Sequence, residues 1–291
     1  MKKLEQLNKR AKIVSEALPY IMEFYDKVIV IKYGGSAMHD PELKKKLLHD
    51  VVLLKYVGMH PVIVHGGGPD INKRLRQKKI ESIFLHGLRV TTKEVMQVVE
   101  NVLGKKVNQE IVSLIKKQGG KAKGFYGKKG HVIKATKHWI KNSHGNYIDL
   151  GYTGSVHGIR FRFLHKWIKK GYIPVLSPIG IGRHGHTYNI NADSAAAAVA
   201  EFLKADKLIL LTDVPGVLGK RKRLISEINT DRIEKMIEQE DISGGMIPKV
   251  ECCLHALKKG VKQVHILDGR VPHVLLLELF TDAGIGTMVV R

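Results

Sequence analysis

Two lysines, Lys32 and Lys249, stand close to glycines in a pattern that suits the binding of phosphate. Lys32 ends the apolar run 28–31 and is followed, after one residue, by Gly34 and Gly35. Lys249 follows the glycine pair 244–245, where a helix is predicted to begin. Backbone N–H groups at glycine turns bind phosphate oxygens, and a lysine ammonium group neutralises their charge. These two segments therefore predict a site that holds a phosphoryl group.

A third glycine turn, residues 66–68, follows the apolar run 61–64 but carries no lysine. The glycine turns do not fit the spacing G-x-x-x-x-G-K-[ST] or G-x-G-x-x-G, so a P-loop and a dinucleotide site are disfavoured. Asp193 precedes a predicted alanine-rich helix. A carboxylate between two lysines holds both in place and keeps both protonated. The alternative is that Asp193 only interacts with the N-terminal dipole of that helix.

Apolar runs that alternate with amphipathic segments predict the elements that position these residues. Buried strands are predicted at residues 28–31, 61–64, 173–176, 207–211, 264–267 and 287–290. Helices are predicted after Asp40-Pro41, from Pro69, from a capping box at 91–94 to about residue 117, and after Asp193. Residues 120–165 are predicted to form short strands and hairpins. This alternation predicts an α/β fold with a mainly parallel sheet and helices on both faces.

Residues 1–24 are predicted to form a separate helix with a narrow apolar stripe. The stripe contains Leu4, Leu7, Ala11, Val14 and Leu18, at spacings of three and four residues. Pro19 is expected to end or kink this helix. A stripe this thin suits docking onto a partner subunit, and the alternative is packing on its own domain.

The chain of 291 residues has a formal net charge of +22, from 49 Lys and Arg against 27 Asp and Glu. This excess raises the possibility of nucleic-acid binding. The basic residues are spread from Lys2 to Lys262, however, and we find no helix-turn-helix, zinc-finger or RNP pattern. Aromatic residues make up only 6%, too few for an obvious base-stacking surface. We therefore favour a generally basic surface and predict no nucleic-acid partner.

The two cysteines, Cys252 and Cys253, are adjacent in the sequence. Adjacent cysteines on a helix point apart, which predicts neither a disulfide nor a zinc site and indicates a reducing cytoplasm. No apolar run reaches the roughly 18 residues of a membrane span. The charged start, residues 1–10, lacks an apolar signal region. We expect a cytoplasmic location, no membrane association and no metal held by protein ligands alone.

Six motifs in a fixed order connect the chain with a known family. They are IKYGG (31–35), VHGGG (64–68), GLRVT (87–91), NINAD (189–193), LTDVPGV (211–217) and GGMIPKV (244–250). From about residue 10 to residue 291 the chain resembles the acetylglutamate kinases, of the amino acid kinase family. The resemblance implies a three-layer αβα sandwich around a mainly parallel sheet. It also implies transfer of the ATP γ-phosphoryl group to the side-chain carboxylate of N-acetyl-L-glutamate, in arginine biosynthesis.

The resemblance implies a role for each candidate site residue. Lys32 and Lys249 stabilise the phosphoryl group in transfer and Asp193 organises them; these three are the implied catalytic residues. Phosphate or the attacking carboxylate is bound by Gly34, Gly35, Gly67 and Gly68. The substrate is held by Arg89 and Asn189. The nucleotide site is lined by Thr212, Asp213 and Val217. Mg²⁺ arrives with ATP and is held mainly by phosphates and water. Residues 25–180 form a lobe for substrate binding and dimerisation, and residues 181–291 form the ATP-binding lobe.

The resemblance also implies regulation. Arginine-sensitive members of the family use an N-terminal helix like residues 1–24 to join dimers into a hexamer, a trimer of dimers. Their arginine site lies between this helix and a C-terminal segment similar to residues 277–288. The implied effector residues are Tyr20, Lys207, Glu278 and Gly284, with L-arginine as inhibitor. Some relatives bind a PII signalling protein, and nothing in this sequence decides whether this protein also binds one.

Other functions remain open from the sequence. N-acetyl-aminoadipate kinase acts on a substrate one methylene longer, which is worth only about 1–3 kcal/mol of discrimination. Aspartate kinase is disfavoured because the chain has no room for its regulatory domains. Uridylate and carbamate kinases are disfavoured because they lack this GLRVT arrangement with the N-terminal helix. Segments 124–130 and 151–156 are less acidic than in relatives, which reflects either the generally basic surface or a change in substrate choice. A basic nucleic-acid-binding protein is the alternative from another class.

Overall fold

The computed structural model describes residues 2–35, 38–142, 144–219, 222–282 and 284–291. Its centre is an eight-stranded sheet. The strands are β1 (Val28–Tyr33), β2 (His60–His65), β5 (Ala122–Phe125), β8 (Ile173–Leu176), β11 (Lys207–Thr212), β12 (Glu227–Asn229), β13 (Gln263–Asp268) and β14 (Thr287–Val290). Their order is β12-β14-β13-β11-β1-β2-β8-β5. Neighbouring strands are parallel except β13 and β14, so the predicted mainly parallel sheet is confirmed.

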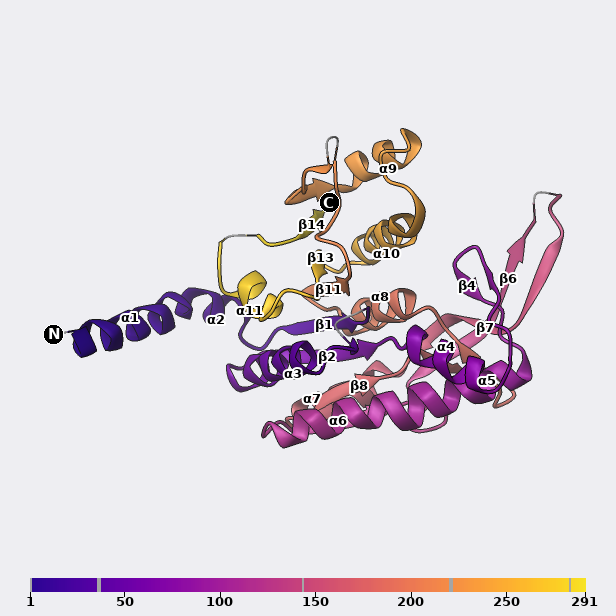
Figure 1. Cartoon of the computed structure of the whole chain (residues 1–291), viewed down its shortest axis with the longest axis horizontal. Coiled ribbons are helices and arrows are strands. Elements are labelled where there is room, and N and C mark those ends of the chain that lie inside the picture. The colour runs from indigo at the N-terminus through magenta and orange to yellow at the C-terminus, as the bar shows by residue number, and fades with distance from the viewer. Residues whose placement is uncertain (1, 36–37, 143, 220–221, 283) are drawn as a thin grey trace.

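Helices cover both faces of this sheet (Figure 1). One layer contains α3 (Pro41–Tyr56), α4 (Gly68–Gln77), α5 (Lys93–Val99), the π-helical η2 (Glu100–Val107), α6 (Asn108–Lys117) and α11 (Val274–Leu279). The other contains α7 (Phe161–Lys169), α8 (Ala192–Leu203), α9 (Thr230–Glu238) and α10 (Ile247–Lys258), which follows the short 3₁₀ turn η4 (Gly244–Met246). The fold is therefore the expected three-layer αβα sandwich.

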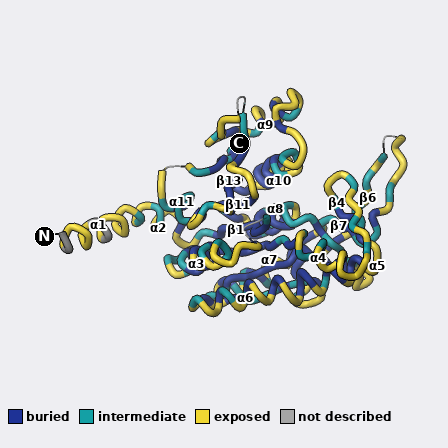
Figure 2. The backbone as a smooth tube through the Cα atoms, viewed as in Figure 1, coloured by how far each residue is buried: buried dark blue, intermediate teal, exposed yellow. Residues whose placement is uncertain are grey.

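Strand β1 shows how the sequence produces two cores. Val28 and Val30 pack in the core beneath α7 to α10, whereas Ile29 and Ile31 pack in the core on the opposite face. Successive side chains of a strand point to opposite faces, so an uninterrupted apolar run serves both layers. Figure 2 shows the buried backbone concentrated in the central strands and exposed residues along the outer helices. Each of the six predicted buried strands is present, within two residues of its expected bounds.

Three local predictions were incomplete. The cap of α5 is Thr92, whose hydroxyl accepts the Val95 N–H, whereas Thr91 is buried. The helix that follows is interrupted by η2 before it continues as α6. Residues 161–165, expected as strand, begin α7, because Leu164 and Ile168 lie four residues apart and bury one helical face.

A second, small sheet adjoins the central one. It consists of β6 (Ile133–Lys141), β7 (Tyr147–Ile159), β9 (Ile179–Ile181) and β10 (Thr187–Asn189), closed in the order β10-β7-β6-β9. The predicted hairpin of this region is confirmed, although β7 is 13 residues long rather than short. A two-stranded hairpin, β3 (Phe84–Leu85) and β4 (Leu88–Arg89), lies nearby.

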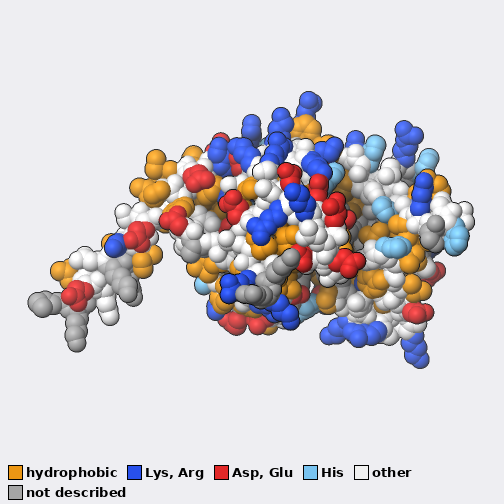
Figure 3. Space-filling model, turned by 90° about the horizontal axis from the view of Figure 1, so that it is seen from above, with side chains coloured by type: hydrophobic (Ala, Val, Ile, Leu, Met, Phe, Trp, Pro, Cys, Tyr) orange, Lys and Arg blue, Asp and Glu red, His pale blue; other side chains and the backbone are white. Residues whose placement is uncertain are grey.

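The N-terminal segment forms two helices rather than one. Helix α1 (Lys2–Glu16) ends before Ala17, and α2 (Leu18–Phe24) has Pro19 in its first turn, where proline needs no hydrogen-bonded N–H. Figure 1 and Figure 3 show α1 projecting from the body of the protein. The side chains of the apolar stripe are exposed, including Leu4, Leu7, Val14 and Leu18. None of the helices in the described ranges combines the length and the hydrophobicity that a membrane span requires.

Candidate active site

The two lysines identified from the sequence meet at one carboxylate. Lys32 Nζ lies 3.0 Å from Asp193 Oδ1, and Lys249 Nζ lies 3.2 Å from Asp193 Oδ2. Lys32 points to the same face of β1 as Val30, which is the face covered by α8 and α10. Asn191 caps α8 by accepting the N–H of Asp193 at 2.9 Å, which fixes the start of the helix that carries the carboxylate.

This cluster carries a net positive charge in a nearly buried place. The exposed fraction of the side chain is 10% for Lys32, 21% for Lys249 and 13% for Asp193. Burial raises the pKa of Asp193, but the two ammonium groups outweigh it and hold the pKa below its ordinary value. One carboxylate thus faces two cations, which leaves one positive charge to interact with an incoming anion.

Two glycine turns lie at the carboxyl ends of neighbouring strands. Tyr33 at the end of β1 pairs with His65 at the end of β2, and the Gly66 N–H donates to the Tyr33 carbonyl at 2.7 Å. Gly35 has φ +76°, and a Cβ there would lie 2.4 Å from Asp213 Oδ1. Gly67 has φ +147°, and its Cβ would lie 2.5 Å from Leu103 Cδ2. Both turns therefore require glycine, at the sheet edge where α/β proteins bind ligands.

Arg89 and Asn189 line a cavity of about 170 Å³ together with the 66–68 turn. The Arg89 guanidinium donates to Asn72 Oδ1 at 2.6 Å and to the Ser82 hydroxyl, and it lies 4.5 Å from the centre of the Phe84 ring. Asn189 Nδ2 donates to the hydroxyl of the buried Thr91, a residue of the motif that contains Arg89. The two predicted substrate residues are thus on walls of one cavity.

The predicted nucleotide residues do not lie together on the surface. Asp213 reaches the Gly35 turn. Thr212 ends β11, and its carbonyl accepts the Gly269 N–H at 2.9 Å. Val217 is fully buried, and its N–H donates to Thr287 Oγ1 at 2.8 Å. The side chain of Val217 therefore packs in the core. Only its backbone is placed to shape the loop that follows β11.

Sequence reasoning missed the polar contacts that hold the 66–68 turn. His65 is fully buried, and its Nδ1 donates to the Gly66 carbonyl at 2.8 Å. Asn108 Nδ2 donates to His65 Nε2 at 3.1 Å and to the Val175 carbonyl at 3.0 Å. Asn108 is the first residue of α6 after the π-helical stretch, so its direction depends on a phase shift that the sequence did not reveal. The histidine was visible beside the glycines but had no evident partner.

Burial lowers the pKa of His65 to about 4, although the hydrogen bond to Gly66 acts in the other direction. A histidine in the unfolded chain has a pKa of about 6.5, so as the pH falls the unfolded state takes up the proton first. Stability from this group is complete above about pH 6.5 and declines as the pH falls towards about 4. The full difference corresponds to about 3 kcal/mol. We expect His65→Asn to flatten the decline of the unfolding free energy over this pH range, measured by urea unfolding; an unchanged slope contradicts the assignment.

The predicted effector residues gather at the opposite end of β11. Tyr20 of α2 donates to Asp282 Oδ1 at 2.6 Å, two residues before Gly284. His265 links the other two, with Nε2 3.3 Å from Lys207 Nζ and Nδ1 2.5 Å from Glu278 Oε1. All three of these side chains are buried.

The same cluster also contacts α2, the second helix of the N-terminal segment, because Lys207 Nζ lies 4.7 Å from the centre of the Phe24 ring. Burial lowers the pKa of Lys207, and Glu278 opposes this effect. His265 was missed from the sequence because it occupies an ordinary strand position between apolar residues. In the described ranges there is no group of three or more His, Cys, Asp or Glu side chains that could hold a metal ion.

An αβα sandwich with two lysines and two glycine turns at the carboxyl edge of its sheet defines a protein that handles phosphoryl groups. Residues 27–268 match the amino acid kinase family. The chain belongs to the amino acid kinase family.

Several proteins of similar sequence are curated as acetylglutamate kinases. One from Heliobacterium modesticaldum is 53% identical over 97% of this chain and 98% of its own length. One from Desulforamulus reducens is 54% identical over 97% of both chains. These identities extend over almost the whole length of each chain.

Solved structures support the fold. N-acetylglutamate synthase from Neisseria gonorrhoeae, complexed with coenzyme A and N-acetyl-glutamate, matches with a TM-score of 0.86 and 24% identity. The match covers 97% of this chain but only 63% of that longer one. Carbamate kinase from Giardia lamblia bound to AMP-PNP matches with a TM-score of 0.66 and 17% identity, over 91% of this chain and 99% of that one.

Proposed function

We propose that the protein transfers the γ-phosphoryl group of ATP to the side-chain carboxylate of N-acetyl-L-glutamate, a step of arginine biosynthesis. The observation that carries this proposal is the Lys32–Asp193–Lys249 cluster beside a cavity lined by Arg89 and Asn189. The names of the curated relatives support the choice of substrate. A cytoplasmic location fits two free cysteines that are both buried.

The chemistry needs positioning and charge neutralisation rather than a general base, because an ionised carboxylate is already a nucleophile. The N–H groups of the two glycine turns hold phosphate and carboxylate oxygens. Lys32 and Lys249 stabilise the charge that develops on the phosphoryl group, and Asp193 keeps them in place. Mg²⁺ bound to the ATP phosphates neutralises further charge, and it is held mainly by those phosphates and by water.

The two lobes divide this work. Residues 25–180 carry Lys32, the glycine turns and Arg89, and they hold the acyl amino acid and a dimer contact. Residues 181–291 carry Asp193, Asp213 and Lys249, and they bind ATP. The site therefore assembles between β1 and β11, the neighbouring strands that come from different lobes.

An ATP-dependent assay that traps the acyl phosphate with hydroxylamine tests the function. We expect product with N-acetyl-L-glutamate and less with N-acetyl-aminoadipate, since one methylene is worth about 1–3 kcal/mol. Preference for the longer acid contradicts the assigned substrate. Product formation with neither acid contradicts the assigned reaction.

Arg89→Ala should raise the KM for N-acetyl-L-glutamate by roughly 10²-fold and leave the KM for ATP nearly unchanged. A guanidinium binds a carboxylate through two charge-assisted hydrogen bonds, each worth about 1.5–3 kcal/mol. Arg76→Ala is the control, because Arg76 is an exposed cation on α4. Steady-state kinetics with each substrate varied in turn measures both constants. An effect confined to ATP excludes Arg89 as the substrate clamp.

We further propose that L-arginine inhibits the enzyme at the cluster of Tyr20, Lys207, Glu278 and Gly284. Glu278 then pairs with the effector guanidinium, in place of His265.

The exposed stripe of α1 joins dimers into a hexamer, and a PII signalling protein is a further candidate partner. Gel filtration with light scattering tests the assembly, and co-elution with a purified PII protein tests that partner.

Glu278→Gln should raise the arginine concentration needed for half-inhibition at least about tenfold, because it removes one charge-assisted hydrogen bond. Glu234→Gln is the matched control, since Glu234 is half exposed and pairs with Lys258 on the surface. Inhibition curves at saturating substrate provide the measurement. Wild-type activity that ignores arginine even at millimolar concentration contradicts the feedback proposal.

A further inference from the structure

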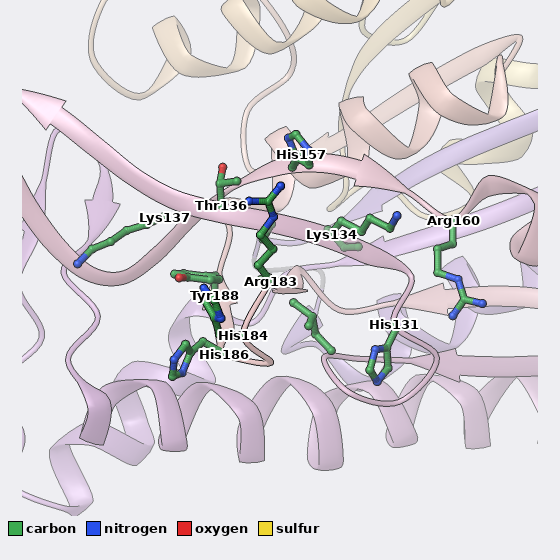
Figure 4. Close-up of a pocket in the computed structure, with 14 residues that line it drawn as sticks. His131, Lys134, Thr136, Lys137, His157, Arg160, Arg183, His184, His186 and Tyr188 are labelled. Atoms are coloured by element: carbon green, nitrogen blue, oxygen red, sulfur yellow. The ribbon is translucent and has the colours of Figure 1, made fainter.

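A second cavity, of about 760 Å³, opens on the small sheet, and the candidate active-site residues do not line it. Figure 4 shows its walls, which come from β6, the end of β7 and the β9–β10 turn. Its basic lining residues are His131, Lys134, Lys137, His157, Arg160, Arg183, His184 and His186. Among the described residues that line it, none is an aspartate or a glutamate.

The charge of this cavity is only partly balanced by carboxylates of the described residues. Elsewhere many lysines pair with carboxylates, as Lys106 does with Asp70 at 2.9 Å and Lys262 with Asp206 at 2.7 Å. In the cavity Lys137 pairs with Asp149 at 2.7 Å. Among the ion pairs of the described residues, none involves Lys134, Arg160 or Arg183. Gathering like charges without counter-charges is unfavourable, so the arrangement favours an anion from outside.

The guanidinium group of Arg160 is held in place by local contacts, and Arg183 stands on a defined turn. Arg160 Nη1 donates to the Gly130 carbonyl at 3.1 Å, and its guanidinium lies 5.0 Å from the centre of the Phe163 ring. Arg183 belongs to a tight turn, closed by the Gly182 N–H donating to the His186 carbonyl at 2.8 Å. In Figure 4 the Arg183 side chain extends from this turn towards β6. A positioned guanidinium loses less freedom when it binds an anion.

The floor of the cavity is apolar. It includes Ile133 and Ala135 of β6, both buried, with Ile181 beside them. An apolar floor beneath the lysine and arginine side chains leaves the charged groups at the rim as the part of the cavity that can meet an anion. Strand β10 also separates this cavity from the candidate substrate pocket: Tyr188 lines the first and Asn189 lines the second.

We propose that this cavity binds an anion that carries several phosphoryl groups. Arginine forks match phosphate oxygens through paired hydrogen bonds, and the several cations around the cavity suit more than one phosphoryl group. The volume is within the range of small-molecule sites. An inorganic oligophosphate and a bisphosphorylated metabolite share this chemistry.

Calorimetric titration of the full-length Lys32→Ala variant tests the proposal, because this background weakens binding of phosphate at the active site. Sodium tripolyphosphate and fructose 1,6-bisphosphate are the two probes, and the tighter one identifies the source. We expect the additional pair Arg160→Ala and Arg183→Ala to weaken binding at least roughly tenfold. The pair Lys116→Ala and Lys117→Ala removes the same charge from exposed positions on α6 and should change affinity less than about twofold.

Three results would overturn the proposal: unchanged affinity in the arginine pair, equal weakening by both pairs, or no binding of either probe to the Lys32→Ala background. If the arginine pair does not fold, Arg183→Gln alone serves instead. Arg183 is exposed on its turn, so this substitution leaves the packing of Arg160 on Phe163 intact. We expect it to weaken binding several-fold, and unchanged affinity counts against the site.

Discussion

Lys32→Ala and Lys249→Ala should each lower kcat by about 10²- to 10³-fold, the range observed when one preorganised group that stabilises transition-state charge is removed. The reason lies in the geometry of the cluster. Both ammonium groups are held by one carboxylate, at 3.0 Å and 3.2 Å. They are therefore in place before charge develops on the phosphoryl group, and no reorganisation is needed when it does. Single-turnover acyl-phosphate formation measures the chemical step directly.

The fold should survive either lysine substitution, because Asp193 keeps one cationic partner. Far-ultraviolet circular dichroism and thermal unfolding check this point. Lys258→Ala is the control, since that exposed lysine pairs with Glu234 on the surface. We expect the double variant Lys32→Ala/Lys249→Ala to lose less than the product of the two single effects, because the lysines act on one phosphoryl group. Near-wild-type turnover in either single variant refutes the assigned role.

Asp193→Asn should have the second largest effect, because it removes the charge that holds two ammonium groups together. The amide keeps the size of the side chain but presents N–H donors to one of the lysines. We expect kcat to fall by about 10²-fold as the lysines separate. Breaking a largely buried ion pair costs about 3 kcal/mol, so the melting temperature should fall by roughly 5 °C.

Added sulfate should partly restore the melting temperature of the Asp193→Asn variant, because an anion can occupy the space between the lysines. Asp206→Asn is the matched control. Asp206 pairs with Lys262, whose side chain is 68% exposed, so solvent already screens that pair. Thermal unfolding of both variants, with and without sulfate, provides the measurement. Wild-type turnover and melting temperature for Asp193→Asn would show that the carboxylate interacts only with the N-terminal dipole of α8.

The sheet and the central cluster were predictable because their signals are local. The apolar runs that end at Lys32 and before Gly66 are strands, and each is followed by a glycine turn. Parallel strands bring such turns to one edge of the sheet. The meeting of Lys249 with Asp193 was anticipated from charge balance alone. What these residues do in the reaction stays a prediction for the substitutions above.

Other features depend on contacts between distant segments. The bond from Asn108 to His65 spans 43 residues and depends on the π-helical stretch that turns Asn108 inwards. His265 became visible only when β13 and α11 placed it between Lys207 and Glu278. The basic cavity escaped notice for the same reason, since its cations are dispersed in the sequence and converge only when the small sheet closes.

The order of the sheet also affects how the protein is made. Strand β12 is held at the sheet edge by β14, which pairs with β13 on its other side. A ribosome reaches β12 well before it reaches β14, and at about 5–20 residues per second the delay is roughly 3 to 12 seconds. During that interval β12 has no partner strand in the sheet. The nascent chain therefore exposes an unpaired strand late in synthesis, a period in which a chaperone that shields strand edges would matter most.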